Sequence, residues 1–245
     1  MRQIPVWDLA TRLFHWLLVL VVVTCFFTGE DEGLEFAVHA YAGFVVLMLL
    51  LFRLGWGIIG SRHSRFGDFV YGWPTIRRYT LSFLRLRPEQ YVGHNPLGGW
   101  MVVLMLLVLT ATALSGIAMI TQGARWLEDV HEALGSLMQV LVFVHIAGVL
   151  ADRLLTGDKI VKAMITGRKE LAEDVALREV PVARVGWAAA FAVLVLFGGA
   201  YLFQQLDYPA SIAAYSAHDD GSVLEELRTE GFLDAMRVKY GGQSS

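Results

Sequence analysis

Five apolar stretches, each near the length that crosses a lipid bilayer, constrain the fold more than any other feature of the chain. They occupy residues 10–28, 36–59, 98–120, 130–150 and 185–203. A helix needs roughly 20 apolar residues to cross the ~30 Å hydrocarbon layer. The chain is 56% hydrophobic and 18% charged, whereas a soluble domain usually carries about 25% charged residues. The sequence therefore predicts an all-α integral membrane protein.

The first apolar stretch is expected to stay in the protein as a transmembrane helix. It contains His15 and Trp16, and the acidic segment 29–35 follows it without a small-x-small cleavage site. A secretory signal peptide would show such a site after its apolar region.

The distribution of charge predicts the orientation of the spans. The connection 60–97 carries six arginines against two acidic residues, and the connection 151–184 carries seven Lys or Arg residues. The connection 28–35 carries four acidic residues and no basic one. Because Lys and Arg concentrate on the cytoplasmic side of membrane proteins, we expect a cytoplasmic N-terminus and, after five spans, a C-terminus outside.

Two segments outside the spans have a helical pattern. Apolar and basic residues alternate at about helical spacing in 75–88. This pattern predicts an interfacial amphipathic helix facing anionic lipid, with a protein-docking surface as the alternative. A helical apolar rhythm also occurs in 222–240, within a tail of seven acidic and three basic residues at 204–245.

These boundaries divide the chain into three parts. Residues 1–168 are predicted to form a transmembrane bundle of four helices, and residues 169–204 a linker and a fifth transmembrane helix. Residues 205–245 form an outer tail that is expected to be partly helical.

Four of the seven histidines lie within or at the ends of the spans, where an ionisable side chain is costly and indicates function. His15 begins an outward-running span and His145 ends an inward-running one, so both are expected near the cytoplasmic face. His39 and His131 each begin inward-running spans, so both are expected near the outer face. Single intramembrane histidines bonded to nearby carbonyls are the alternative, which the matched depths disfavour.

The spacing along the fourth span suggests two separate centres. His131 and His145 are 14 residues apart, which is about four helical turns, so their rings share a helix face ~21 Å apart along the axis. Two imidazoles from facing helices suit haem iron better than zinc, which would need a third protein ligand. The one cysteine, Cys25, is not part of a C-x-x-C-H sequence, which excludes ordinary covalent haem attachment.

Small and cationic residues near these histidines fit the same interpretation. Gly43 and Gly135 each follow an outer histidine by four residues, where a flat macrocycle would need clearance. Arg12 and Arg53 are candidate partners for the propionates of the inner haem, with contact of Arg12 to lipid phosphate as its alternative. At the outer face, Arg125 is the one candidate.

Three strings in the chain resemble a known family. The strings 12-RLFHW-16, 53-RLGWGIIGSRHSRFGDF-69 and 93-GHNPLGGW-100 resemble the bacterial cytochrome b561 and nickel–iron hydrogenase b-type cytochrome subunit family, and the resemblance covers about residues 3–168. It implies a four-helix transmembrane bundle with two b-type haems.

By the same resemblance, the iron ligands are the pairs His15/His145 and His39/His131, as the depth argument also indicates. His94 lies in the third string, and two roles stay open for it: a neighbour of a haem propionate or of a quinone.

The sequence thus predicts a dihaem b-type cytochrome of the bacterial cytoplasmic (inner) membrane, with a periplasmic C-terminus. It would transfer electrons between the quinone pool and a periplasmic redox partner, either a hydrogenase-like protein or a c-type cytochrome. Membrane lipid is an expected partner, a homodimer stays open, and the net charge of −3 gives no indication of nucleic-acid binding.

Two other functions stay open. One is a stand-alone quinone oxidoreductase, such as a superoxide:quinone enzyme. The other is a histidine-dependent proton or metal transporter, which is less favoured because no Asp or Glu lies in the middle of a span.

Overall fold

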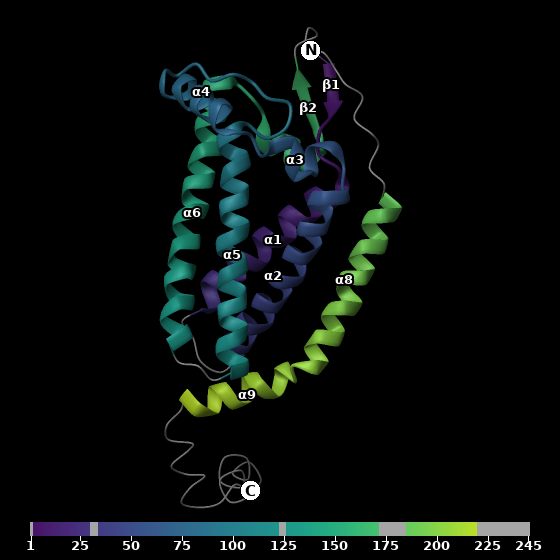
Figure 1. Cartoon of the computed structure of the whole chain (residues 1–245), viewed down its shortest axis with the longest axis vertical. Helices are drawn as coiled ribbons and strands as arrows, with labels where there is room; N and C mark the ends of the chain where they lie inside the picture. The colour runs from purple at the N-terminus through teal and green to yellow at the C-terminus, as the bar shows by residue number, and fades with distance from the viewer. Residues whose placement is uncertain (1, 30–33, 123–125, 172–184, 220–245) are drawn as a thin grey trace, which may run out of the picture.

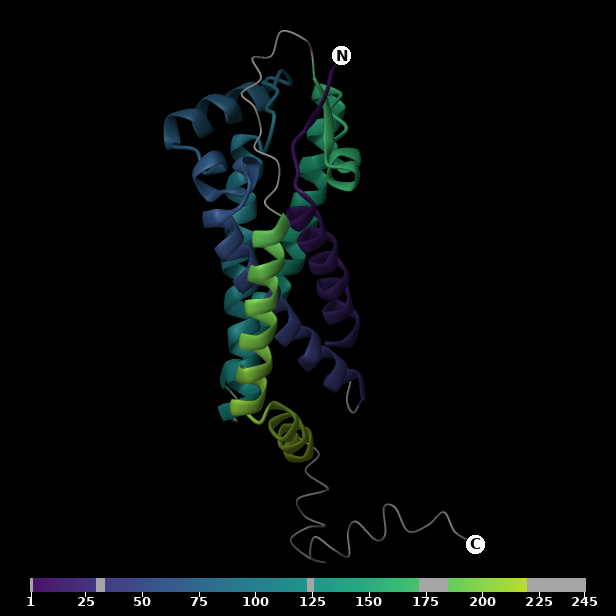
Figure 2. The same ribbon diagram turned by 90° about the vertical axis from the view of Figure 1, so that its right-hand side faces the viewer.

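A computed structural model describes residues 2–29, 34–122, 126–171 and 185–219. Within these ranges, five long helices run between the two ends of the molecule (Figures 1 and 2): α1 (Leu9–Thr28), α2 (Leu34–Ile59), α5 (Pro96–Gln122), α6 (Trp126–Thr156) and α8 (Val185–Gln205). Each is long and apolar enough to cross a membrane. The predicted class of a helical, multi-pass membrane protein is therefore confirmed. The fourth span is longer than expected at both ends.

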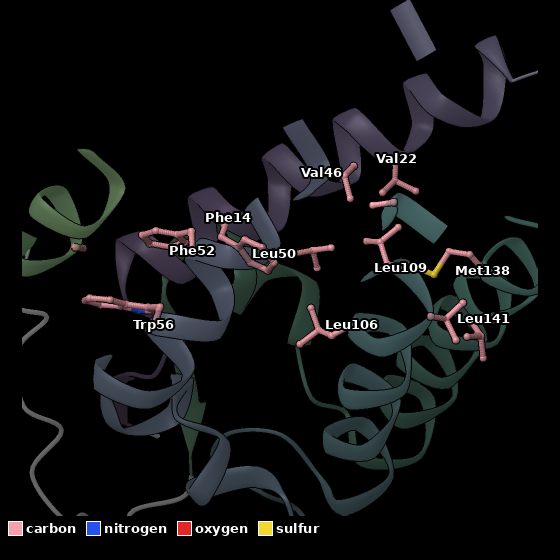
Figure 3. Close-up of a cluster of buried hydrophobic side chains, with 13 residues drawn as sticks. Phe14, Val22, Val46, Leu50, Phe52, Trp56, Leu106, Leu109, Met138 and Leu141 are labelled. Atoms are coloured by element: carbon pink, nitrogen blue, oxygen red, sulfur yellow. The ribbon is translucent and has the colours of Figure 1, made fainter. Parts of the chain in front are cut away.

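The four helices α1, α2, α5 and α6 form the bundle, and α8 packs outside it against α2. A cluster of buried side chains packs between the helices of the bundle, as Figure 3 shows for Leu50, Leu109 and Met138. Phe52 and Trp56 on α2 stack with their ring centres 6.0 Å apart. Aliphatic and aromatic packing therefore sets the spacing of the helices that carry the histidines.

Shorter elements gather at the end of the bundle where the basic connections lie (Figure 1): η1 (Arg62–Ser64), α3 (Phe66–Phe69), α4 (Trp73–Leu84), α7 (Ile160–Thr166), β1 (Arg2–Pro5) and β2 (Arg168–Leu171). The two strands pair antiparallel, with Pro5 opposite Arg168. The sequence analysis did not predict this sheet. It joins the N-terminus to the segment that follows the fourth span.

Helix α4 confirms a helix within the amphipathic segment, although it starts earlier than expected and ends at Leu84. Its inner side is fixed by Tyr79, which is 1% exposed and donates a hydrogen bond of 2.9 Å to Asp152 Oδ1 on α6. Burial, followed by the charge of Asp152, raises the pKa of Tyr79, so the hydroxyl keeps the proton that it donates. The opposite side exposes Trp73 and Leu84, each 72% accessible. Helix α4 thus presents apolar side chains while its buried side is anchored to the bundle.

At the opposite end of the bundle, α9 (Tyr208–Asp219) runs across the ends of the long helices (Figure 1). The sequence analysis expected a partly helical tail but did not locate this helix. The segment 222–240, which it did single out, lies outside the described residues, as does Arg125.

Asp8 joins three segments at the end of the bundle that carries the strands. It is the N-cap of α1, and its Oδ1 accepts a 2.8 Å hydrogen bond from the backbone N–H of Thr11. Its Oδ2 accepts hydrogen bonds from Trp56 Nε1 at 3.3 Å, from Ser64 Oγ at 2.6 Å and from Ser61 Oγ. Burial raises the pKa of Asp8, but the hydrogen bonds from Ser61, Ser64 and Thr11 outweigh it, and the net pKa is lowered. The carboxylate therefore holds the start of α1 to the end of α2.

We expect Asp8→Asn to destabilise the folded protein in detergent by about 1–3 kcal/mol. The substitution replaces one carboxylate oxygen by an amide NH₂ group, which cannot accept the hydrogen bonds that the carboxylate now accepts. The contribution of Asp8 is present above its unfolded pKa of about 3.9 and is lost as the pH falls through its lower folded value. Thermal unfolding should therefore show a difference between wild type and variant that shrinks below about pH 4.

Asp68→Asn is the matched control, because the Asp68 carboxylate is 31% exposed and its ion pairs within the described residues are with Arg62 and Arg65 at the surface. It should change stability by less than about 1 kcal/mol. Equal effects of the two substitutions at neutral pH would contradict the role given to Asp8.

Candidate functional site

At the end of the bundle near α9, two histidine rings face each other across the core. His39 on α2 and His131 on α6 have ring centres 5.9 Å apart and ring planes at 84°. Imidazole–metal bonds are about 2 Å long, so two rings bound to one metal from opposite sides have centres about 6 Å apart. The distance between the His39 and His131 rings would therefore allow both to bind one metal ion, as the predicted pairing requires.

The other two helices of the bundle fix which nitrogen of each ring is free. His39 Nδ1 lies 3.0 Å from the carbonyl oxygen of Cys25 on α1. His131 Nδ1 lies 2.9 Å from the carbonyl oxygen of Thr112 on α5, and 3.2 Å from Ser115 Oγ. Because a carbonyl oxygen only accepts, each Nδ1 carries a proton and donates it. Nε2 of a neutral ring is then left with its lone pair, as metal-binding histidines require.

A glycine that the sequence analysis did not single out allows α5 to approach the His131 ring. A Cβ atom at Gly116 would lie 2.8 Å from His131 Cε1 and 3.1 Å from His131 Nδ1, closer than such atoms pack. Gly116 follows Ser115, so one turn of α5 supplies both the space for the ring and a hydrogen-bonding partner. No local pattern in the sequence marks this position, because the contact joins residues on two different helices.

Gly43 and Gly135 were predicted to give clearance beside the same two histidines. A Cβ atom added at either position would meet no other atom within 4 Å. The backbone at both glycines therefore borders open space, which is compatible with a flat ligand. Their role as clearance stays a prediction.

At the other end of the bundle, His15 on α1 and His145 on α6 lie near His94, which precedes α5. The His94 ring packs edge-on against Trp7, with centres 4.7 Å apart, and against Phe69 at 4.6 Å. Burial is the largest cause that lowers the pKa of His94, followed by the positive charges of Arg53, His145, His63 and His15, and together they bring it to about 3. His94 is therefore neutral at pH 7, and the predicted inner histidines are brought to one end of the bundle.

Four buried side-chain nitrogens in the described part of the chain have no hydrogen-bond partner, and all belong to this end: Arg12 Nε, His15 Nδ1, Arg53 Nη1 and His94 Nδ1. Arg53 is 3% exposed, and its guanidinium carbon lies 4.8 Å from the centre of the Phe66 ring. Buried polar groups normally find partners. Unpartnered guanidinium nitrogens beside a histidine are suited to hold an anionic group of a cofactor.

These donors fit haem better than a metal ion held by protein alone. Among the residues that the structure describes, no three His, Cys, Asp or Glu side chains are grouped as ligands of one ion. Two imidazoles with free Nε2 atoms leave the remaining ligands to the cofactor, as a porphyrin supplies them. Arg12 and Arg53, each with a buried nitrogen that has no partner among the described residues, stay the candidates for haem propionates.

Comparison with known proteins gives the same family as the sequence motifs. The family model described as prokaryotic cytochrome b561 matches residues 6–167, which include all four intramembrane histidines. No solved structure matches the chain.

Curated relatives carry a consistent name. The chain is 25% identical over 215 residues to the probable Ni/Fe-hydrogenase B-type cytochrome subunit of Rhizobium leguminosarum bv. viciae, covering 69% of this chain and 89% of that protein. It is 29% identical over 210 residues to the protein of the same name from Cupriavidus necator, covering 66% and 85%. The probable Ni/Fe-hydrogenase 1 B-type cytochrome subunit of Escherichia coli K12 is 29% identical over 140 residues, covering 44% of this chain and 59% of that protein.

The family match spans well over half of the chain and confirms the resemblance found in the sequence. Cytochromes of this family carry b-type haem and transfer electrons in membranes. The chain therefore belongs to the prokaryotic cytochrome b561 family of multi-pass, haem-binding membrane proteins.

Proposed function

We propose that this protein is a dihaem b-type cytochrome that carries electrons across the bacterial inner membrane between the quinone pool and a periplasmic redox protein. The observation that carries the proposal is the pair His39 and His131, with ring centres 5.9 Å apart and both Nδ1 atoms at backbone carbonyls. A second pair at the other end, His15 and His145, would hold the second haem.

Different residues would hold the haem at each of the two proposed centres. The carbonyls of Cys25 and Thr112 orient the outer rings and raise the basicity of their free nitrogens. At the inner centre, Arg53 and Arg12 would hold propionates. When bound, each b-type haem would supply a one-electron centre, and a pair of histidines that held its iron would leave no position for oxygen. This favours electron transfer over oxygen chemistry.

The basic connections and the named relatives support an orientation in the membrane and a type of redox partner. Basic connections at the end that carries the strands support a cytoplasmic location for that end, so α9 would lie on the periplasmic side. The relatives named as Ni/Fe-hydrogenase subunits favour a hydrogenase-like partner over a c-type cytochrome.

Substitution of single histidines tests the pairing. We expect His39→Leu and His131→Leu each to lower the haem content of the purified protein from two per chain to one, with the same low-spin EPR signal lost in both. His15→Leu and His145→Leu should both remove the other signal. His63→Leu is the control, because His63 is a half-buried histidine outside both pairs. Pairs that share no signal, or retention of both haems, would contradict the assignment.

The same variants test electron transfer. In proteoliposomes with a water-soluble quinol outside and ferricyanide trapped inside, wild type should reduce the trapped ferricyanide. His39→Leu and His145→Leu should each abolish this reduction, because the path needs both centres, whereas His63→Leu should leave it intact. Full rates with one haem missing would exclude a transmembrane path, and superoxide oxidation by the purified chain with quinone alone would favour the stand-alone enzyme.

Gly116→Ala should disturb only the outer centre. The new methyl group would push the His131 ring from its position, so we expect a shifted or lost outer low-spin signal and a normal inner one. Gly198→Ala is the control, because a Cβ atom there meets nothing within 4 Å and alanine is favoured over glycine in a helix by about 1 kcal/mol. If the low-spin EPR signal of the outer haem is unchanged in Gly116→Ala, Gly116 does not provide the space that the His131 ring needs.

Arg53→Gln and His94→Gln distinguish a propionate site from a quinone site. If these side chains hold a propionate, the substitutions should lower the inner haem potential, because a nearby positive charge or donor favours the reduced state. The KM for quinol should then stay the same. A raised KM with an unchanged potential assigns the side chains to quinone. Arg78→Gln, at a side chain 64% exposed, is the control; absence of both effects would reject both roles.

A further inference from the structure

The C-terminal helices α8 and α9 lie beyond residues 6–167, the part of the chain that the family model matches. Helix α8 packs along α2, where the Phe191 and Phe52 rings have centres 5.7 Å apart. A Cβ atom at Gly199 would collide with the side chain of Met48. This close packing brings α9 across the end of the bundle that holds His39 and His131 (Figures 1 and 2).

Tyr208, the first residue of α9, is the contact that fixes this arrangement. It is 1% exposed, and its hydroxyl donates a 3.2 Å hydrogen bond to the carbonyl oxygen of Ala40. Its ring packs against Phe44 and Phe203, with centres 5.4 Å and 5.8 Å away. Burial raises the pKa of Tyr208 to about 12, so the hydroxyl stays protonated as a donor. Ala40 directly follows His39, so this bond holds the helical turn that carries an outer histidine.

The rest of α9 closes the same end of the bundle with apolar side chains. Ile212, one turn after Tyr208, is 6% exposed. It belongs to a buried cluster with Met119 and Ile120 from the end of α5 and Leu127 from the start of α6. The cluster therefore includes side chains from the helices that carry and support both outer histidines. These buried side chains cover the end of the bundle at which α9 lies.

We propose that Tyr208 is a positioning residue for the outer haem centre, holding the turn of α2 that carries His39 and, with α9, excluding water from that centre. The inference rests on the proposed function, because it takes His39 as an axial ligand. The C-terminal segment lies outside residues 6–167, the part that the family model matches. The proposal gives this segment a role in setting the redox potential of the outer haem.

The expected consequence is local. Ligand orientation and the exposure of a haem to solvent both tune its potential. Water near the centre stabilises the oxidised, more positively charged state, so loss of the Tyr208 contact should lower the outer potential. The inner centre lies at the other end of α6, ~21 Å away along the helix axis, and should keep its potential.

Redox titration of the full-length protein, with each haem followed by its own low-spin EPR signal, tests the proposal. For Tyr208→Ala we expect the reduced-to-oxidised ratio of the outer haem at a fixed ambient potential to fall about tenfold, a shift of ~59 mV for one electron. Tyr208→Phe keeps the ring and removes only the hydrogen bond, so it should shift the same haem in the same direction by less. The inner haem should not shift in either variant.

Tyr201→Phe is the matched control, since Tyr201 lies on α8 and is 61% exposed; it should leave both potentials unchanged. Unchanged outer potentials in both Tyr208 variants, or equal shifts of both haems, would overturn the proposal. If Tyr208→Ala does not fold, Tyr208→Phe alone decides between these outcomes. A wild-type protein without two separate low-spin haems would instead overturn the proposed function itself.

Discussion

An imidazole ring inside an apolar span must find its hydrogen-bond partners within the protein, and this constraint organises the structure around the histidines. At the outer pair the constraint is met by backbone. The carbonyls of Cys25 and Thr112 each accept from an Nδ1 atom, although both belong to helices that carry neither ring of that pair. Four helices must therefore pack in register for two rings to be oriented, which links the bundle fold directly to the geometry of the site.

The inner end meets the same constraint in a different way. There, among the residues that the structure describes, His15 Nδ1, Arg53 Nη1 and His94 Nδ1 are buried without a hydrogen-bond partner. The nearby Asp8 carboxylate, in contrast, accepts hydrogen bonds from Thr11, Trp56 and Ser64. A buried guanidinium is stable only if an anion or a set of acceptors compensates its charge. The contrast between a carboxylate with several donors and a buried guanidinium nitrogen without an acceptor is the physical reason to expect an anionic cofactor group at this end.

Hydropathy and charge were enough to predict the spans, because insertion into a bilayer depends on the local composition of each segment. The histidine pairs followed from the direction of each span, and Arg53 from its apolar surroundings. By contrast, Gly116 and Asp8 act through contacts with residues distant in the chain, and α9 depends on Tyr208 packing against α2. Such contacts leave no periodic trace in the sequence, so they could not be predicted from it. The short sheet was missed for the same reason, since Pro5 pairs with Arg168.

In the proposed dihaem arrangement, the two centres would share helix α6 and differ in the other residues that hold them. Because His131 and His145 both lie on α6, the continuous backbone of that helix fixes their separation along its axis, whatever happens at either end. Their partners come from separate helices with separate anchors: His15 follows the N-cap at Asp8, and His39 lies beside the carbonyl that Tyr208 binds. In the proposed arrangement, each centre could therefore be tuned at its own end of the bundle without a change in the distance between the two.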